Sequence, residues 1–295
     1  MQAALGNIAA RLAPGWYVRF TGQTGRGADE TSLEEVASYF QQCYDDYLAV
    51  LKRSINAGPD YFHDKRLLEY GPGDLPGVAM LMMASGARQT ICVDRFPLVQ
   101  LSAKNCQIAQ ILLDRLPQVQ RDRVLACFVE SGRLDSGCRP DKVQYLVKPS
   151  GLSGLQNEID VVFSRAVLEH VNDLPATFRD MHDALKPGGI AIHQVDLKSH
   201  GLHRANPLDF LCWPHWLWSL MYSAKGVPNR LRINAYRDAI RAAGLEILLL
   251  EPGLLAAEKE IRAVRPQLAS AFRNLPDEDL SWLEFWLVCQ KPVTA

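Results

Sequence analysis

The pattern of hydrophobic and polar positions divides the chain into an N-terminal helical part and a longer part of alternating strands and helices. Residues 1–30 mix apolar residues with glycines, which predicts a short helix and then an exposed loop over TGQTGRGAD. Ser32 and Glu35 have the spacing of a capping box, so we expect a helix to begin there. Apolar residues recur at helical spacing as far as Leu51, and the helix is expected to end near residues 56–59.

Short apolar runs follow, separated by helical patterns and turn residues. Strand after helix after strand predicts parallel βαβ units, and hence a doubly wound, mostly parallel, seven-stranded α/β sheet of Rossmann-like form with helices on both faces. Ligands of such sheets bind at the carboxyl ends of the strands, near the point where the strand order reverses. The expected strands are 65–70, 89–94, 142–147, 159–164, 189–197, 245–251 and 282–288, and the expected helices are 75–85, 97–116, 176–185 and 234–243.

The connections suggest how the chain is divided. We expect residues 1–58 to form an N-terminal helical cap and residues 59–295 to form the main domain. Within the main domain we expect an aromatic-rich lid insertion at 198–233 and a helical insertion at 254–280. The pattern assigns no element to residues 123–140, a segment longer than a simple connection needs.

Composition and charge narrow the class of protein. A chain of 295 residues that is 48% hydrophobic can form one large core with an accessory part. The formal net charge of -1, with no basic stripe and no base-flipping motif, argues against nucleic acid as a partner. Seven cysteines without a CxxC pair predict reduced thiols of a cytoplasmic protein. We expect no integral membrane segment, because no run approaches the ~20 apolar residues that span a bilayer.

The turn after the first strand, LLEYGPGDLPG at residues 67–77, raises the question of a ligand. Gly71 and Gly73 permit torsions and close approaches that other residues prevent. The GxGxxxG spacing departs from the dinucleotide fingerprint, and Glu69 would repel a pyrophosphate but suit a cationic group. Asp94 ends the second strand, where its carboxylate can accept hydrogen bonds from both hydroxyls of a ribose or, alternatively, cap the next helix.

Four segments in this order resemble those of class I S-adenosylmethionine-dependent methyltransferases: LLEYGPG, CVDRF, IDVVFSRAVLEHVNDL and ALKPGGIAIHQVDL. The resemblance implies S-adenosylmethionine as the cofactor, with Glu69 facing its methionine amino group. The turn Tyr70-Gly71-Pro72-Gly73 would pass under the methionine portion, and Asp94 would bind the ribose. The resemblance also implies cofactor contacts from Arg95, Phe96, Ser150, Gly151, Ser164 and Arg165. Many members have a third glycine where this chain has Leu75.

Methyl transfer to a hydroxyl requires alignment of the reactants, exclusion of water and usually a general base. His200, after the fifth strand, is our first candidate for that base and His203 the second, and Asp196 can orient either histidine. His170 follows the fourth strand beside Glu169, where it can serve catalysis or support the loop. We expect no metal ion in the site.

The segment 198–233 is rich in aromatic residues. It predicts either a flap packed on its own apolar face or a lid over the acceptor, and a peripheral membrane contact is a further alternative. Its arginines can bind an anionic acceptor group or tie the flap to the sheet. The candidate acceptor-binding residues are His203, Arg204, Trp213, Trp216, Tyr222, Arg230 and Arg232.

The run from HQVDL through NRLR to AGLEI also resembles a subgroup associated with bacterial polysaccharide and glycolipid assembly. That resemblance implies O-methylation of a sugar or glycoconjugate hydroxyl. The alternatives are an O- or N-methyltransferase of a small natural product or aromatic compound and a non-catalytic binding protein with the same fold. Glu69 and the irregular glycine spacing oppose a nicotinamide-dependent oxidoreductase. The oligomeric state is left open.

Overall fold

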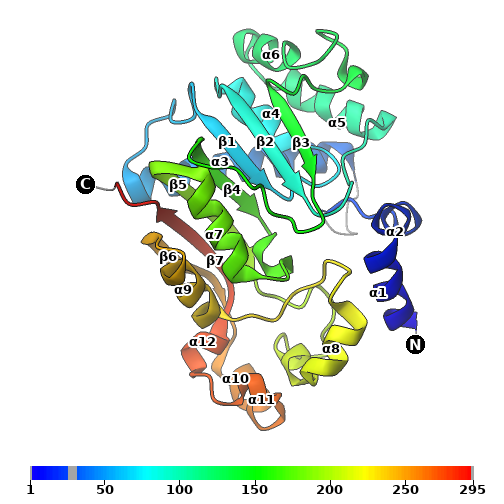
Figure 1. Ribbon diagram of the computed structural model, residues 1–295, viewed down its shortest axis with the longest axis vertical. Helices are drawn as coiled ribbons and strands as arrows, with labels where there is room; N and C mark the ends of the chain where they lie inside the picture. Colours follow the sequence, from blue (N-terminus) through cyan, green and yellow to red (C-terminus); the bar gives the residue numbers. More distant parts are fainter. Residues whose placement is uncertain (1, 26–31, 294–295) are drawn as a thin grey trace.

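The computed structural model describes residues 2–25 and 32–293 (Figure 1). Its sheet has seven strands in the order β3-β2-β1-β4-β5-β7-β6. The first five strands pair in parallel, and β7 runs antiparallel to both β5 and β6. The predicted mostly parallel, Rossmann-like α/β sheet is confirmed. The strands are β1 (Arg66–Tyr70), β2 (Gln89–Asp94), β3 (Val143–Val147), β4 (Ile159–Arg165), β5 (Leu185–Asp196), β6 (Glu246–Leu255) and β7 (Trp282–Gln290).

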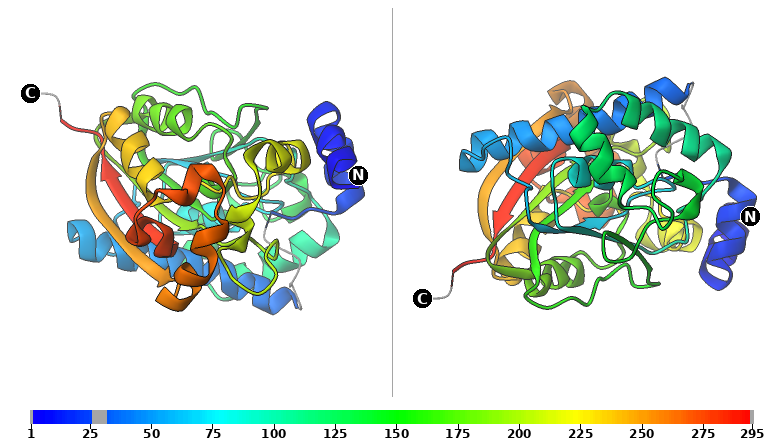
Figure 2. Two further views of the ribbon diagram at one scale, coloured as in Figure 1. Left: turned by 90° about the horizontal axis from the view of Figure 1, so that it is seen from below. Right: turned by 90° about the horizontal axis from the view of Figure 1, so that it is seen from above.

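Helices cover both faces of the sheet (Figures 1 and 2). Because side chains alternate along a strand, Leu67 of β1 packs into the core beneath α3, α4 and α5, whereas Leu68 packs beneath α7 and α9. The helices are α1 (Gln2–Leu12), α2 (Pro14–Thr21), α3 (Leu33–Ile55), α4 (Gly77–Ala84), α5 (Ala103–Asp114), α6 (Gln118–Leu125), α7 (Leu174–Ala184), α8 (His215–Tyr222), α9 (Ile233–Ala242), α10 (Glu258–Val264), α11 (Ser270–Arg273) and α12 (Asp277–Ser281). Short 3₁₀ turns are η1 (Leu134–Ser136), η2 (Leu168–His170), η3 (Asp209–Cys212) and η4 (Arg265–Gln267).

The long N-terminal helix forms as its sequence predicts. The Ser32 side chain accepts a hydrogen bond from the Glu35 amide at 3.1 Å, and Asn56 ends the helix in the left-handed conformation. Phe40 and Tyr47 of this helix are buried in the core of the sheet. The domain boundary at residue 58 stays a prediction, because α3 shares its core with the sheet.

The helix expected over 97–116 begins later than predicted. Residues 97–102 form a loop, and α5 starts at Ala103 with Ser102 as its cap, which accepts from the Asn105 amide at 3.1 Å. The Gln100 amide instead donates to the Asp74 carbonyl at 2.9 Å. Residues 123–140, which the sequence pattern left unassigned, contain the end of α6, the turn η1 and a bridge between Phe128 and Cys138.

The two predicted insertions pack against each other. Phe210 and Trp218 from the 198–233 segment share a small core with Ile261 and Phe272 from the segment before β7. This arrangement agrees with a flap packed on its own apolar face. Among the described residues all seven cysteines are free thiols, and no helix there is long and apolar enough to cross a bilayer.

Candidate functional site

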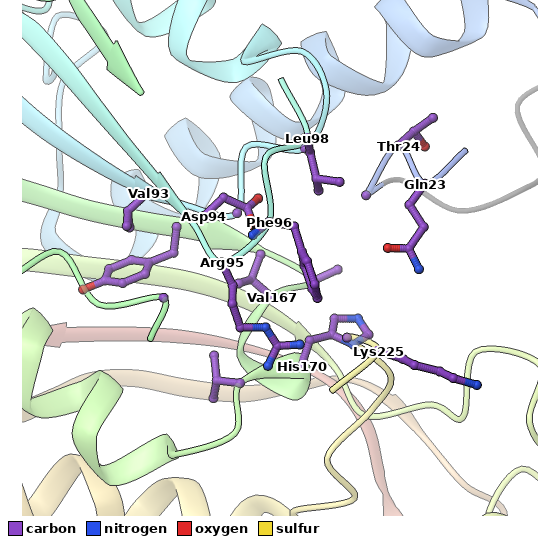
Figure 3. A pocket seen from close by; sticks show the side chains of 18 of the residues that line it. Gln23, Thr24, Val93, Asp94, Arg95, Phe96, Leu98, Val167, His170 and Lys225 are labelled. Atoms are coloured by element: carbon purple, nitrogen blue, oxygen red, sulfur yellow. Dashed lines mark hydrogen bonds between the residues drawn. The ribbon is translucent and has the colours of Figure 1, made fainter. Parts of the chain in front are cut away.

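A cavity of about 450 Å³ lies at the carboxyl ends of β1, β2 and β4 (Figure 3). The strand order reverses between β1 and β4, which is where ligands bind in such sheets. The volume of the cavity is in the range of small-molecule and cofactor sites. The cavity is lined by residues 21–25, Tyr70, Gly71, Gly73, residues 93–96, Leu98, Ser150, Gly151, Ala166, Val167, residues 170–172, Thr177, His200, Lys225 and Gly226.

The glycine turn after β1 forms one wall of the cavity. Gly71 has φ 65°, and a Cβ atom there would meet Val167 Cγ2 at 2.6 Å. Gly73 has φ 74°, and a Cβ atom there would meet the Thr24 carbonyl oxygen at 2.9 Å. Both positions therefore require glycine for conformation and for space, and the exposed backbone of the turn faces the cavity.

The third glycine of the turn, Gly77, has a structural role that the irregular GxGxxxG spacing did not predict. A Cβ atom on Gly77, the first residue of α4, would meet the Phe40 ring at 2.5 Å. Gly77 thus lets α4 approach α3, as the third glycine of a fingerprint turn lets a helix approach its neighbour. Leu75, which stands where many members of the resembling family have glycine, is buried in the core.

Asp94 lies at the end of β2 and faces the cavity. Its Oδ1 accepts a hydrogen bond from the Phe96 amide at 2.9 Å. Burial raises the pKa of Asp94 to about 6, opposed by the Phe96 and Arg95 amides and by the Arg95 charge. Since α5 begins only at Ala103, Asp94 does not cap a helix, and its carboxylate can accept hydrogen bonds from ligand hydroxyls.

Glu69 does not line the cavity, contrary to the expectation of a contact with a ligand amino group. It is buried on the α4 face of the sheet, where the Cys92 thiol donates to its Oε2 at 3.5 Å. Burial raises the pKa of Glu69 to about 8. Pro72 also lies outside the lining, whereas Tyr70 contributes to it and its hydroxyl donates to Asp180.

The end of β4 corrects two further expectations. Ser164 is buried and bonds the His193 Nδ1 at 2.7 Å, so it points into the core. Arg165 lies on the other face, where it pairs with Asp46 at 2.6 Å. Successive strand residues point to opposite faces, and neither face is the edge where the cavity opens. Ala166, with φ 52°, and Val167 line the cavity instead.

The expected adenine side of the cavity contains Arg95, Phe96, Ser150 and Gly151. The Arg95 guanidinium carbon lies 4.8 Å from the centroid of the Phe96 ring. Burial lowers the pKa of Arg95, although Asp94 opposes the shift. The Phe96 ring, with the Arg95 guanidinium over it, offers a surface against which an aromatic base can pack.

Two histidines and two carboxylates converge where the chain leaves β4 and β5. His200 Nε2 lies 3.6 Å from Asp196 Oδ2 and 3.9 Å from Glu169 Oε1, while His170 Nε2 lies 3.8 Å from Glu169 Oε1. The two imidazole rings meet edge to face, with centroids 4.8 Å apart. Glu169, His170 and His200 offer ligand atoms within 4.8 Å of one another, so the cluster can in principle hold a divalent metal ion.

Burial controls the protonation of this cluster. It lowers the pKa of His170 to about 3, and it lowers the pKa of His200 against the opposing charge of Asp196. Burial also raises the pKa of Glu169 well above its ordinary value, and the nearby Asp196 adds to the shift. Both imidazoles are therefore neutral near pH 7, as a general base must be.

The candidate acceptor-binding residues lie away from the cavity. Arg230 donates to the Trp213 carbonyl at 2.6 Å, and Arg232 donates to the Leu197 carbonyl at 3.0 Å. Both guanidinium groups are buried and tie the flap to its surroundings, the alternative that the sequence had left open. His203, Arg204, Trp213, Trp216 and Tyr222 are likewise absent from the cavity lining.

One wall of the cavity comes from a segment predicted to be an exposed loop. In Figure 3, Gln23 and Thr24 face Asp94 and Phe96 across the cavity. The Thr24 carbonyl accepts from the Asp74 amide at 2.9 Å, which fastens this segment to the glycine turn. The glycines of TGQTG were the available signal. The rest of the expected loop, residues 26–29, lies outside the described residues.

Comparisons with known proteins place the chain in a family. Residues 39–250 match a sequence family described as a methyltransferase domain. No curated protein matches the sequence. Among solved structures, an S-adenosylmethionine-dependent methyltransferase from Mesorhizobium loti is 19% identical, with a TM-score of 0.44, and the match covers 81% of this chain and 95% of that one.

Two further solved structures match at low identity. A Methanosarcina mazei S-adenosylmethionine-dependent methyltransferase is 13% identical, with a TM-score of 0.46 and coverage of 79% of this chain and 94% of that one. Phosphoethanolamine N-methyltransferase 2 of Haemonchus contortus, in complex with S-adenosyl-L-methionine, is 18% identical, with a TM-score of 0.46. The match covers 84% of this chain and 52% of that one. The family match extends over more than two thirds of the chain, and the chain therefore belongs to the methyltransferase-domain family, as a class I S-adenosylmethionine-dependent methyltransferase.

Proposed function

We propose that this protein methylates a hydroxyl oxygen of a sugar or glycoconjugate. The observation that carries the proposal is the imidazole of His200, which lines the cavity with Asp196 Oδ2 at 3.6 Å from its Nε2. S-adenosylmethionine supplies an electrophilic methyl group. The protein must then hold the cofactor, exclude water and receive the proton of the acceptor hydroxyl.

The cofactor would be held by the residues at the ends of β1 and β2. Asp94 would accept hydrogen bonds from the ribose hydroxyls, and the backbone of Gly71 and Gly73 would allow the methionine portion to approach closely. Arg95 and Phe96 would line the adenine side. Glu69, which is neutral near pH 7, lies behind the glycine turn. It would support the turn and would not contact the cofactor itself.

His200 would receive the proton as the hydroxyl attacks. Asp196 would orient the ring and stabilise the imidazolium that forms. His170, neutral and facing the cavity, would hydrogen bond the acceptor. The polar side chains of Gln23 and Asn172 and the apolar ones of Val167 and Val171 suit a sugar, which presents hydroxyls on its edge and C–H groups on its faces.

The test uses S-adenosylmethionine with an isotopically labelled methyl group and panels of glycans, phenols and amines, with product mass spectrometry. His200→Gln should lower kcat by about 10²–10⁴-fold while leaving the cofactor Kd unchanged. His203→Gln is the matched control, because His203 lies off the cavity. A product methylated at nitrogen, or an unchanged kcat for His200→Gln, would contradict the proposal.

A further inference from the structure

Helix α1 turns its apolar side away from the protein. Leu5, Ile8 and Leu12 share one stripe of the helix and are each 50–77% exposed. The buried side of the same helix contains Asn7 and Ala10. An amphipathic helix on a globular protein normally buries its large apolar residues, so this orientation is inverted.

Helix α2 repeats the arrangement. Trp16 and Phe20 stack on one another with centroids 5.1 Å apart and lie largely in solvent, while Tyr17 and Val18 are buried. Two aromatic rings that stack in solvent stabilise each other only a little. Burial of both rings in an apolar environment would be more favourable.

Helix α8 completes the surface. Trp216 and Leu220 are one turn apart and both more than half exposed, whereas Trp218 is buried. Asn7 of α1 donates to the Ser219 and Leu220 carbonyls at 3.2 and 3.1 Å, so α1 and α8 lie side by side, as both views of Figure 2 show. We call the exposed apolar side chains of these three neighbouring helices together the outer face: Leu5, Ile8, Leu12, Trp16, Phe20, Trp216 and Leu220.

The charge of these helices has one sign. Residues 2–25 contain Arg11 and Arg19 and no Asp or Glu, in a chain whose formal net charge is -1. Residues 213–227 add Lys225, also without an acidic residue. Arg11 and Arg19 are exposed beside the apolar stripes. Large apolar and aromatic side chains flanked by basic ones are typical of helices that lie in a membrane interface.

We infer that the outer face docks on the surface of an anionic lipid bilayer. The bilayer would bury the apolar side chains, and its negative surface would attract Arg11 and Arg19. A second copy of the chain fits less well, because a two-fold interface through this face would bring these arginines toward each other.

The outer face adjoins the mouth of the cavity. Thr21, directly after Phe20, lines the cavity, and so does Lys225, three residues after the end of α8. Docking would therefore bring the cavity to the lipid surface, where a lipid-linked acceptor can enter. The nature of that acceptor rests on the proposed function, whereas the docking does not.

The test measures co-sedimentation of the full chain with vesicles, without cofactor or acceptor. Phosphatidylcholine vesicles are compared with equal mixtures of phosphatidylcholine and phosphatidylglycerol. The wild type should bind the anionic vesicles, and the combined variant Trp16→Ser, Phe20→Ser and Trp216→Ser should bind at least about tenfold more weakly. Arg11→Gln with Arg19→Gln should weaken binding to the anionic vesicles only.

The matched control is Val119→Ser with Val129→Ser. These side chains are as exposed as those of the outer face but lie on α6 and the segment after it, so binding should not change. The inference is overturned if the wild type fails to bind the anionic vesicles, or if the triple variant binds them as the wild type does. It is also overturned if light scattering finds a wild-type dimer that the triple variant converts to a monomer. Because no methyl transfer is measured, failure of the proposed chemistry leaves this result unaffected.

Discussion

His200 Nε2 lies 3.6 Å from Asp196 Oδ2 at the edge of the cavity, beyond hydrogen-bonding distance but close enough for the carboxylate charge to act on the ring. Asp196 also contacts Lys198 Nζ at 3.1 Å. Glu169, on the other side of His200, is buried without a hydrogen bond, and its pKa is raised well above the ordinary value. The imidazole thus lies between Asp196 and Glu169, whose charged form burial disfavours.

The pH dependence of catalysis follows from this arrangement. Burial lowers the pKa of His200, so kcat/KM should rise with pH through a value below 6.5 and then level off. Asp196→Asn removes the charge that holds this pKa up, so the acid limb should move to lower pH. The plateau should fall by about 10–100-fold, because the imidazolium loses its partner. A profile of kcat/KM against pH measures both changes. An acid limb at the same pH in Asp196→Asn and in the wild type would show that Asp196 does not act on His200.

Asp94 should dominate cofactor affinity. Asp94→Ala removes up to two charge-assisted hydrogen bonds, each worth about 1.5–3 kcal/mol, so the Kd for S-adenosylmethionine should rise by at least about 100-fold in calorimetry. Asp94→Asn keeps an oxygen for the Phe96 amide and should lose only about tenfold. Equal affinity of Asp94→Ala and the wild type would remove Asp94 from the cofactor site.

The glycine turn should be intolerant of a single methyl group. Gly71→Ala combines a left-handed backbone with a 2.6 Å contact to Val167, and we expect it to lower the free energy of unfolding by about 2–4 kcal/mol. Gly132→Ala is the matched control, since φ is 83° but no atom lies within 4 Å, and about 1 kcal/mol should be lost. Adding Val167→Ala to Gly71→Ala should restore part of the lost free energy of unfolding, as measured in a denaturant titration. If no stability is restored, the contact with Val167 does not cause the loss.

Glu69 should make the protein less stable in alkali. Its folded-state pKa of about 8 exceeds the ordinary 4.5, so the folded state binds the proton more tightly, and stability falls as pH rises between these values. The contribution is roughly 3–5 kcal/mol, at about 1.4 kcal/mol per pH unit. Glu69→Gln should lose this slope. The free energy of unfolding of the wild type and of Glu69→Gln is measured at pH 5 and pH 8, and the difference between the two proteins isolates the contribution of Glu69. The same change with pH in both proteins would contradict the prediction.

Catalysis should not require a metal ion. Although Glu169, His170 and His200 are close enough to share one, burial disfavours the charged carboxylate that a metal ion would need from Glu169. Activity should therefore survive EDTA, and the purified protein should contain less than one equivalent of metal by elemental analysis. One bound equivalent that Glu169→Gln releases would reassign the cluster.

The sequence alone determined the strands, the glycine turn, the cap at Ser32 and the position of Asp94, because each depends on local periodicity or on the end of one strand. Only the tertiary structure decided that Gly77 fits against Phe40, that Thr24 closes the cavity, and that Ser164 and Arg165 point away from it. It also separated Arg230 and Arg232 from the cavity and brought Glu169 beside His200. These facts depend on which face of an element is buried and on contacts between distant segments, and local patterns carry neither.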